Sequence, residues 1–434
     1  MDFSLPKLSN LRNSETSRID STDNDFVPIL ENQNSSPIQS FQSFPEEKPA
    51  VPFDEILREF RHFYTQRPWS RGPQGQYKIM SYNVLSDHCI KKSQRGLYSC
   101  KPEDLDIEKR SKLIIDEIKY HDPDLLALQE VDEGYEAYTS LEGYEKWYKK
   151  RLRTDLDGCM ILWKSSLFTL VERFDVEYYS EDPEFQNYLS KANIGIITIL
   201  RLNSEDSKYI LFANTHFLFS PHKGDRQFCQ IYTMLKSIEA ILVKYTGFDV
   251  SILFAGDFNL TPCGGIYHFL ENKILNLLWV KKEDLNSRYI GLEKKATYKR
   301  ILEVFRTPFS YKDHQYMNNC EIAHILNSIR VQLIGNTFTP VFCNTDIDED
   351  GTIAHNLDIK SCYKSCVRYE PFPTTFLDDS RSTVDYIWYG GSVAPSRVLM
   401  SPRFEFLDGF SGAPNEILPS DHFPIIAEFN FINH

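Results

Sequence analysis

Six short blocks of this sequence each place an Asn, Asp, Glu or His at the edge of an apolar run. They occupy residues 80–85, 128–131, 214–217, 255–259, 382–389 and 419–424. Side chains of these types can hold a hard divalent ion, position a water molecule and exchange protons. One block alone would decide little. Six of them in one chain predict the active site of a Mg²⁺-dependent phosphodiester hydrolase, with Mn²⁺ as the alternative ion.

The first candidates concern the metal ion. Mg²⁺ prefers oxygen ligands, keeps several waters and needs only one or two protein carboxylates. Glu130, at the end of an apolar strand, is the expected direct ligand, and Asn83 is expected to orient Glu130 or the substrate phosphate through its amide. The complete set of candidate metal ligands is Glu130, Asp257, Asn259 and His422. The sequence fits one ion or two.

The next candidates concern water and phosphate. Asp257 and Asn259 are two residues apart on a segment expected to be extended, so both side chains should point to the same side. This carboxylate and this amide are expected to hold the attacking water and the phosphate. His216 is expected to bind or protonate the phosphoryl group.

Asp385 is acidic within an otherwise apolar strand, and a buried carboxylate needs a partner. His422 is the expected partner, because an Asp–His pair orients the imidazole and stabilises its charged form. Asp421, next to His422, is a further catalytic candidate.

Ordinary structural roles compete with these assignments. Short polar side chains cap turns and helices, and a histidine can be satisfied within a core. Such roles also fit Asn83, Asp257 with Asn259, Asp421 and His216. Six polar sites at strand ends are nevertheless much harder to explain together than singly, which favours the catalytic interpretation.

Strands and helices must bring these blocks together. Apolar runs predict strands at residues 77–85, 125–129, 158–163, 194–201, 209–214 and 251–255. Periodicity predicts helices at residues 53–66, 101–121 and 226–244, and one more near residues 320–330 within a stretch that otherwise lacks clear periodicity. This alternation predicts an α/β layered fold with the site at one sheet edge.

The composition indicates how the chain is organised. Residues 1–50 are rich in Ser, Asn, Asp and Pro and are expected to form a disordered tail that could contact RNA-processing or translation proteins. Residues 51–434 are expected to form one catalytic domain, with a long insert around residues 305–350. No membrane span or signal peptide is evident, and nine scattered Cys suit a reducing compartment, so the cytoplasm or nucleus is expected.

The distribution of charge gives weaker evidence about binding partners than the polar blocks give about catalysis. The net charge of −13 favours short, local contacts with nucleic acid over a grip on a long duplex. Basic runs at residues 149–153 and 294–300 are interpreted as solvated surface.

Residues 346–351 match the start of a Ca²⁺-binding EF-hand loop. The position of its bidentate Glu is Leu357, so a solvated acidic loop is favoured over a Ca²⁺ site.

Over about residues 67–431 the blocks resemble the endonuclease/exonuclease/phosphatase superfamily. Residues 81–85, 214–216, 385–389 and 419–422 are most similar to its branch of nocturnin, Angel and carbon-catabolite-repression deadenylases, and residues 67–69, 222–225 and 374–375 to Angel proteins. The resemblance implies two packed mixed β-sheets flanked by helices, in four layers. It implies a metal on Glu130 and a scissile phosphate surrounded by Asn83, His216, Asp257, Asn259, Asp385 and His422. It also implies that Arg226 and Gln230 help to hold substrate.

One position departs from the poly(A)-specific members of this branch. They place a stacking Phe five residues before the Asp of the Asp-Tyr-Ile-Trp motif, and here that position is Ser380. Phe376 is the candidate substitute for contact with a base, and a stacked base is worth about 1–3 kcal/mol. Little preference for adenine is therefore expected.

The resulting expectation is a hydrolase that acts on the 3′ ends of single-stranded RNA. The leading reaction is 3′-to-5′ exonucleolysis in RNA processing or decay. Removal of a 2′,3′-cyclic phosphate, as in Angel-like proteins, uses the same metal and water and is the first alternative. Small-molecule phosphatase activity and a catalytically inactive RNA-binding scaffold are the others. The scaffold is disfavoured because Glu130, Asp257, Asp385, Asp421 and His422 are all intact.

Overall fold

The computed structural model describes residues 51–92, 98, 100–134, 136–152, 155–287, 309–310, 320–344, 350–377 and 380–432. The predicted tail at residues 1–50, the basic run at residues 294–300 and residues 346–349 of the EF-hand-like loop lie outside the described residues. Predictions about those segments therefore stay predictions.

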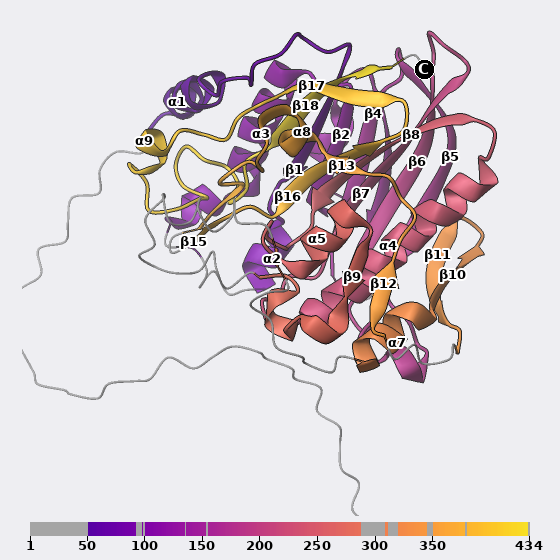
Figure 1. The fold of residues 1–434 in the computed structure, drawn as a ribbon. Coiled ribbons are helices and arrows are strands. Elements are labelled where there is room, and N and C mark those ends of the chain that lie inside the picture. Colours follow the sequence, from indigo (N-terminus) through magenta and orange to yellow (C-terminus); the bar gives the residue numbers. More distant parts are fainter. Residues whose placement is uncertain are drawn as a thin grey trace, which may run out of the picture. The chain divides into compact units, whose positions relative to one another are not determined.

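Two large mixed sheets form the centre of the fold (Figure 1). The six-stranded sheet has the order β17 (Val393–Val398), β18 (Ile425–Phe431), β1 (Tyr77–Asn83), β2 (Leu125–Asp132), β4 (Asp157–Lys164), β3 (Tyr144–Lys150). The eight-stranded sheet has the order β10 (Ile329–Ile334), β11 (Thr337–Phe342), β5 (Phe168–Glu177), β6 (Ile194–Leu202), β7 (Lys208–His216), β8 (Asp249–Asp257), β16 (Asp385–Gly390), β13 (Lys360–Ser361). Two small two-stranded sheets, β9 (Ile274–Asn276) with β12 (Thr352–Ala354) and β14 (Thr375–Leu377) with β15 (Ser380–Ser382), lie outside them.

The two large sheets pack face to face through apolar side chains. Their shared core takes residues from both sheets, among them Ile79, Leu125, Ile161 and Ile425 from one and Ile196, Ile210, Leu253 and Ile387 from the other. Because both faces of each sheet are covered, these strands read as nearly continuous apolar runs rather than as alternating ones.

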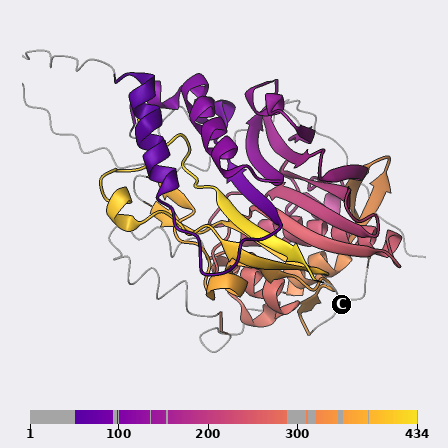
Figure 2. The same cartoon turned by 90° about the horizontal axis from the view of Figure 1, so that it is seen from above.

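Helices cover the outer faces (Figure 2). The outer face of the six-stranded sheet packs against α3 (Ile107–His121). The eight-stranded sheet packs against α4 (Gly224–Lys244), with α5 (Gly265–Asn272) and α7 (Cys320–Ser328) in the same cluster. Farther out, α1 (Phe53–Thr65) lies against α3 and α9 (Phe404–Leu407). The short helices α2 (Asp87–Lys92) and α8 (Cys362–Val367) complete the set of described α-helices. The predicted fold class, two packed mixed sheets flanked by helices, is confirmed.

All six predicted strands are present, whereas β3, β5 and β17 were not predicted. Further differences lie at helix ends and in the insert. The helix predicted at residues 101–121 is split, because Asp106 caps a new start and its side chain accepts a hydrogen bond from the Glu108 amide at 2.9 Å. The helix predicted at residues 320–330 ends at Ser328, where the hairpin of β10 and β11 begins. This hairpin joins the eight-stranded sheet through β5, so part of the predicted insert belongs to the main fold. None of the described helices is both long and apolar enough to span a bilayer.

Candidate active site

One edge of the two sheets gathers the polar blocks. The parallel strands β1 and β2 bring Asn83 opposite Gln129, directly before Glu130. Strands β7 and β8 are also parallel and place His216 opposite Asp257. Because β16 runs antiparallel to β8, Asp385 at its start meets the end of β8. The antiparallel β18 likewise brings residues 419–422, which precede it, to the end of β1.

Glu130 stands at a bulge in β2. Gln129 pairs with Cys159 and Val131 pairs with Gly158, so Glu130 is an extra residue between them, and its backbone has the left-handed φ of 59°. A bulge re-aims a side chain, and a non-glycine residue keeps such a φ only where its surroundings fix it. The side-chain amide of Asn83 donates a hydrogen bond to Glu130 Oε1 at 3.1 Å, and the backbone N–H of Ser86 donates one to Oε2 at 3.0 Å. Hydrogen bonds thus hold both oxygens of this half-exposed carboxylate in place.

Asp257 is the centre of the site and is 1% exposed. Its Oδ2 accepts a hydrogen bond from the Asn83 amide at 3.2 Å and lies 3.4 Å from His216 Nε2 and 3.7 Å from His422 Nε2. Its position depends on Gly256, because a Cβ there would lie 2.2 Å from the Thr215 carbonyl oxygen.

Asn259 differs from the expectation. The extended segment ends at Asp257, and Asn259 adopts the left-handed φ of 54°. Its amide N–H donates to Asp257 Oδ1 at 2.9 Å, which is the Asx-turn of the competing interpretation, while its side chain donates to the Phe217 carbonyl at 3.1 Å. Asp257 and Asn259 are therefore linked by a turn, through the Asn259 backbone, and the predicted alternation of a strand is absent at Asn259.

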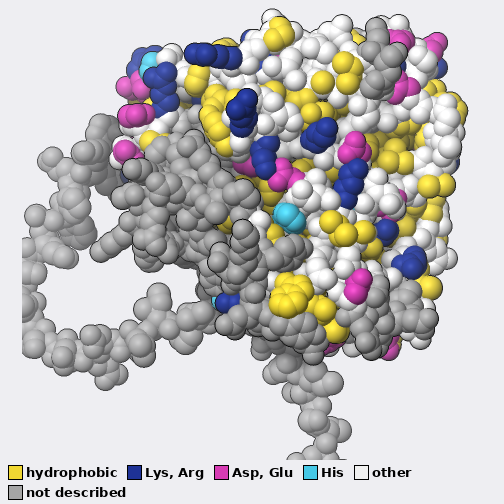
Figure 3. Space-filling view, viewed as in Figure 1, with side chains coloured by type: hydrophobic (Ala, Val, Ile, Leu, Met, Phe, Trp, Pro, Cys, Tyr) yellow, Lys and Arg dark blue, Asp and Glu magenta, His cyan; other side chains and the backbone are white. Residues whose placement is uncertain are grey.

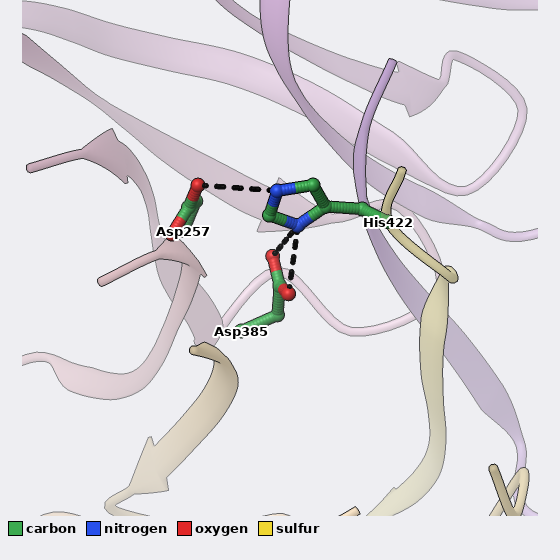
Figure 4. A group of neighbouring side chains, drawn as sticks. All are labelled: Asp257, Asp385 and His422. Carbon is green, nitrogen blue, oxygen red and sulfur yellow. Dashed lines mark hydrogen bonds and ion pairs between the residues drawn. The ribbon is translucent and has the colours of Figure 1, made fainter. Parts of the chain in front are cut away.

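The predicted pair of Asp385 and His422 is in contact (Figure 4). His422 Nδ1 lies 3.2 Å from Asp385 Oδ1 and 3.0 Å from Oδ2. Burial alone would lower the pKa of His422, but the carboxylates of Asp385 and Asp257 raise this pKa to about 10. The two carboxylates thus favour the imidazolium form of His422.

This protonation state bears on metal binding. Asp257, Asp385 and His422 offer ligand atoms within 4.8 Å of one another, as a metal site would. Both ring nitrogens of His422 face carboxylates, however, and an imidazolium has no lone pair to give an ion. The contacts of this group are those of a hydrogen-bonded triad, and Glu130, the metal ligand expected from the sequence, is not part of it.

Asp421 is half-buried beside His422 and contacts Tyr98. Burial raises the pKa of Asp421, and the nearby charge of Glu130 raises it further, while His422 opposes this. Tyr98 donates a hydrogen bond to Asp421 Oδ2 at 3.2 Å, whereas buried Oδ1 has no hydrogen-bond partner among the described residues. Two neighbouring carboxylates, one with an unsatisfied oxygen, fit a bound divalent cation that prefers oxygen ligands.

The loop before β18 is tied to β1. Ser420 Oγ donates to the Asn83 carbonyl at 2.8 Å and accepts from the His422 amide at 3.2 Å. The seven predicted catalytic residues and Glu130 thus lie at one edge of the sheets, joined through Asn83, Asp257 and residues 420–422.

Of the three predicted substrate contacts, only Arg226 is partly exposed, in the first turn of α4. Gln230 is buried: its Oε1 accepts from the Leu218 amide at 2.9 Å and its Nε2 lies 3.4 Å from Asn193 Oδ1, so it fixes the loop after His216. Phe376 is fully buried and packs against Phe423, with ring centroids 6.3 Å apart. Its ring is a core element and does not face a substrate.

Sequence reasoning missed Arg151. It lies in the basic run assigned to solvated surface, yet its guanidinium is 2.7 Å from His216 Nδ1 and 2.8 Å from Asp157. The sequence pattern does not distinguish Arg151 from the two lysines that precede it in the run.

Comparison with known proteins gives a consistent picture. The model of the Endonuclease/Exonuclease/phosphatase family matches residues 80–422. Carbon catabolite repressor protein 4 homolog 3 of Arabidopsis thaliana is 28% identical over 403 residues, 88% of this chain and 80% of that protein. Protein angel homolog 2 of Bos taurus is 30% identical over 387 residues, 82% of this chain and 69% of that protein.

Solved structures give the same result. The crystal structure of ANGEL2, a 2′,3′-cyclic phosphatase, in complex with adenosine-2′,3′-vanadate has a TM-score of 0.66 and 28% identity, and the match covers 84% of this chain and 98% of that one. The human Nocturnin catalytic domain, at 17% identity and a TM-score of 0.50, shows likeness of fold alone.

Proposed function

Because the chain belongs to the Endonuclease/Exonuclease/phosphatase family, we propose that it is a Mg²⁺-dependent hydrolase that acts on the 3′ ends of RNA. The family membership confirms the resemblance predicted from the six blocks, including the likeness to Angel and carbon catabolite repressor proteins. The ion, the RNA substrate and the reaction are the proposal.

The observation that carries the proposal is the division of the site into two halves. Glu130, oriented by Asn83 and near Asp421, would hold the ion. Mg²⁺ would neutralise charge on the phosphoryl oxygens and on the leaving oxygen. In the other half, Asp257 accepts hydrogen bonds and can take a proton from the attacking water. His422, kept protonated by Asp385, can donate to a phosphoryl oxygen as charge develops there.

Hydrolysis of a terminal 2′,3′-cyclic phosphate is the reaction we place first. ANGEL2 is a 2′,3′-cyclic phosphatase, and this chain matches 98% of its structure at 28% identity. The burial of Phe376 supports this order, because the predicted substitute for the stacking Phe is not available to hold an adenine. The order of the two reactions is therefore the reverse of the one expected from the sequence.

Exonucleolysis in the 3′-to-5′ direction is the second candidate. The similarity to carbon catabolite repressor protein 4 homolog 3 along 88% of the chain favours it, since that branch is the one for which the sequence predicts deadenylase-like activity. Both reactions break a phosphorus–oxygen ester bond with water, so the same residues serve either. Lys and Arg side chains are interspersed with Asp and Glu on the face of the molecule shown in Figure 3.

The test compares three RNA oligomers of one sequence that end in 3′-OH, 3′-phosphate or 2′,3′-cyclic phosphate, each with Mg²⁺ and with a chelator. Loss of the cyclic end group without shortening of the chain would support the first reaction. A ladder of shortened products would support the second and displace the first. No product from any end in the presence of Mg²⁺ would overturn the proposal in favour of an inactive RNA-binding scaffold.

A further inference from the structure

Arg151 connects a buried carboxylate to the active-site histidine of β7. It follows β3 directly, and its backbone N–H donates to the Asp157 carbonyl at 2.9 Å. Its Nε donates to Asp157 Oδ2 at 2.8 Å, and its terminal nitrogen lies 2.7 Å from His216 Nδ1. The Arg151 side chain is 15% exposed and that of Asp157 is 1% exposed. The Arg151 guanidinium is therefore held by Asp157 through Nε and contacts the His216 imidazole through a terminal nitrogen.

The chemistry of the two groups determines where the proton of His216 lies. A guanidinium carries five N–H donors and no acceptor, and it stays protonated in proteins. In a hydrogen bond with Arg151, His216 Nδ1 must therefore be the acceptor and carry no proton. A neutral imidazole with a bare Nδ1 carries its proton on Nε2. That nitrogen faces Asp257 Oδ2 at 3.4 Å, in the centre of the site.

We infer that Arg151 is a positioning residue that holds His216 as the neutral Nε2–H tautomer. His216 then presents an N–H to the centre of the site and works as a hydrogen-bond donor, not as the group that protonates the phosphoryl oxygen. The role of this donor in catalysis rests on the proposed function, whereas the tautomer does not. The two histidines of the site thus have different partners: His422 Nδ1 faces a carboxylate, whereas His216 Nδ1 faces a guanidinium.

A substrate-binding role for Arg151 is the competing explanation, and the anchoring argues against it. An arginine that binds a phosphate in bidentate fashion needs two parallel N–H donors that are not already engaged within the protein. Here Nε is taken by Asp157 and one terminal nitrogen by His216.

The tautomer can be measured without substrate or metal, by long-range ¹H–¹⁵N correlation of the histidine rings in the full chain, with the His216 signals identified from their loss in His216→Gln. We expect a bare Nδ1 and a protonated Nε2 at neutral pH. Arg151→Met, which keeps length and removes every donor, should lose this single form, and Arg151→Lys, which keeps one charged donor, should retain it. A doubly protonated ring or a proton on Nδ1 in the wild type would overturn the inference.

Kinetics on the best RNA substrate give the second readout. Arg151→Met should lower kcat by about 10- to 100-fold and change KM less than about threefold, with partial recovery in Arg151→Lys. Arg397→Met is the matched control, because Arg397 also forms an ion pair with a buried carboxylate, Glu428, at 2.7 Å and is 22% exposed. Glu428 lies opposite Lys78, five residues before Asn83 along β1, so turnover should be unchanged.

The outcomes separate the two proposals. A rise in KM with unchanged kcat and an unchanged His216 tautomer in Arg151→Met would assign Arg151 to substrate binding and refute the positioning role. The expected tautomer pattern in a protein that turns over none of the RNA ends would uphold the inference about Arg151 while the proposed function fails.

Discussion

Asp385 lies directly opposite Asp257 in the antiparallel register of β16 and β8, and both carboxylates are buried. Two such charges side by side would repel each other in a low-dielectric site. His422 relieves this by placing Nδ1 3.0 Å from Asp385 and Nε2 3.7 Å from Asp257 (Figure 4). The pairing of two strands thus places the His422 ring between two carboxylates, which favour its charged form.

The first prediction concerns this triad. Asp385→Asn keeps the shape and removes the charge that holds His422 protonated, so kcat should fall by at least about 100-fold with little change in KM. His422→Ala should be about as damaging. The double variant should be scarcely worse than either single one, because groups that act as a unit are not additive. Steady-state kinetics on the preferred RNA end measures all three.

Asp408→Asn is the control for the loss of an aspartate charge. Its side chain is 68% exposed and pairs only loosely with Arg381, so kcat should stay within about twofold of wild type. If the rate losses of Asp385→Asn and His422→Ala multiply in the double variant, the two residues act independently and the triad has to be abandoned.

The second prediction concerns the metal ligand. Glu130→Gln can still accept a hydrogen bond but removes the anionic ligand at the bulge, so Mg²⁺-dependent turnover should fall below about a tenth of wild type, a loss of more than about 1.4 kcal/mol of transition-state stabilisation. Activity measured across a Mg²⁺ titration checks this. Glu133→Gln is the matched control, since Glu133 lies just beyond β2 and pairs with Lys150 at a partly exposed site. Equal activity of Glu130→Gln and Glu133→Gln would show that the ion binds elsewhere.

The third prediction concerns base choice. Because Phe376 is buried against Phe423, Phe376→Ala should lower the free energy of unfolding by about 3–5 kcal/mol, as expected for a core phenylalanine. Wild type should prefer poly(A) over mixed-sequence RNA of equal length by less than about tenfold, or 1.4 kcal/mol. Denaturant unfolding and competition between the two RNAs provide the measurements. A larger preference that disappears in Phe376→Ala while the fold survives would return this ring to the substrate site.

The sequence predicts the strand ends of the site because their signal is local. Each polar residue follows or precedes an apolar run that forms a strand. The pairing of that strand with its neighbours then places the residue at the edge of the sheets where the site lies. The bulge at Glu130 escapes this reasoning, because the pairing of β2 with β4 creates it. The turn at Asn259 is local, and the sequence offered it only as the alternative to an extended segment.

Reasoning from local sequence patterns also misses contacts between residues that are far apart in the chain. Arg151 gains its role from His216, 65 residues later, and Phe376 loses its predicted role because Phe423 buries it. Residue type alone does not distinguish a surface arginine from one that fixes an imidazole, or a stacking ring from a core ring.

The last prediction concerns stability and is independent of catalysis. Burial raises the pKa of Glu370 to about 7, against the opposing effect of hydrogen bonds such as the one that Tyr267 donates to Oε1 at 2.5 Å. Since the ordinary value is 4.5, the folded state holds this proton between pH 4.5 and about 7 while the unfolded state releases it. Stability must therefore fall as pH rises through this window.

Glu370→Gln keeps an acceptor for Tyr267 and cannot ionise, so it should escape this loss. Relative to wild type, its free energy of unfolding should be similar near pH 4 and higher by up to about 3 kcal/mol above pH 7, because one pKa unit corresponds to about 1.4 kcal/mol. Denaturant unfolding at a series of pH values measures the difference. Glu405→Gln, at an exposed position in α9, should show none. A difference between Glu370→Gln and wild type that does not grow with pH would mean that Glu370 is ionised in the folded protein and that an unseen partner compensates its charge.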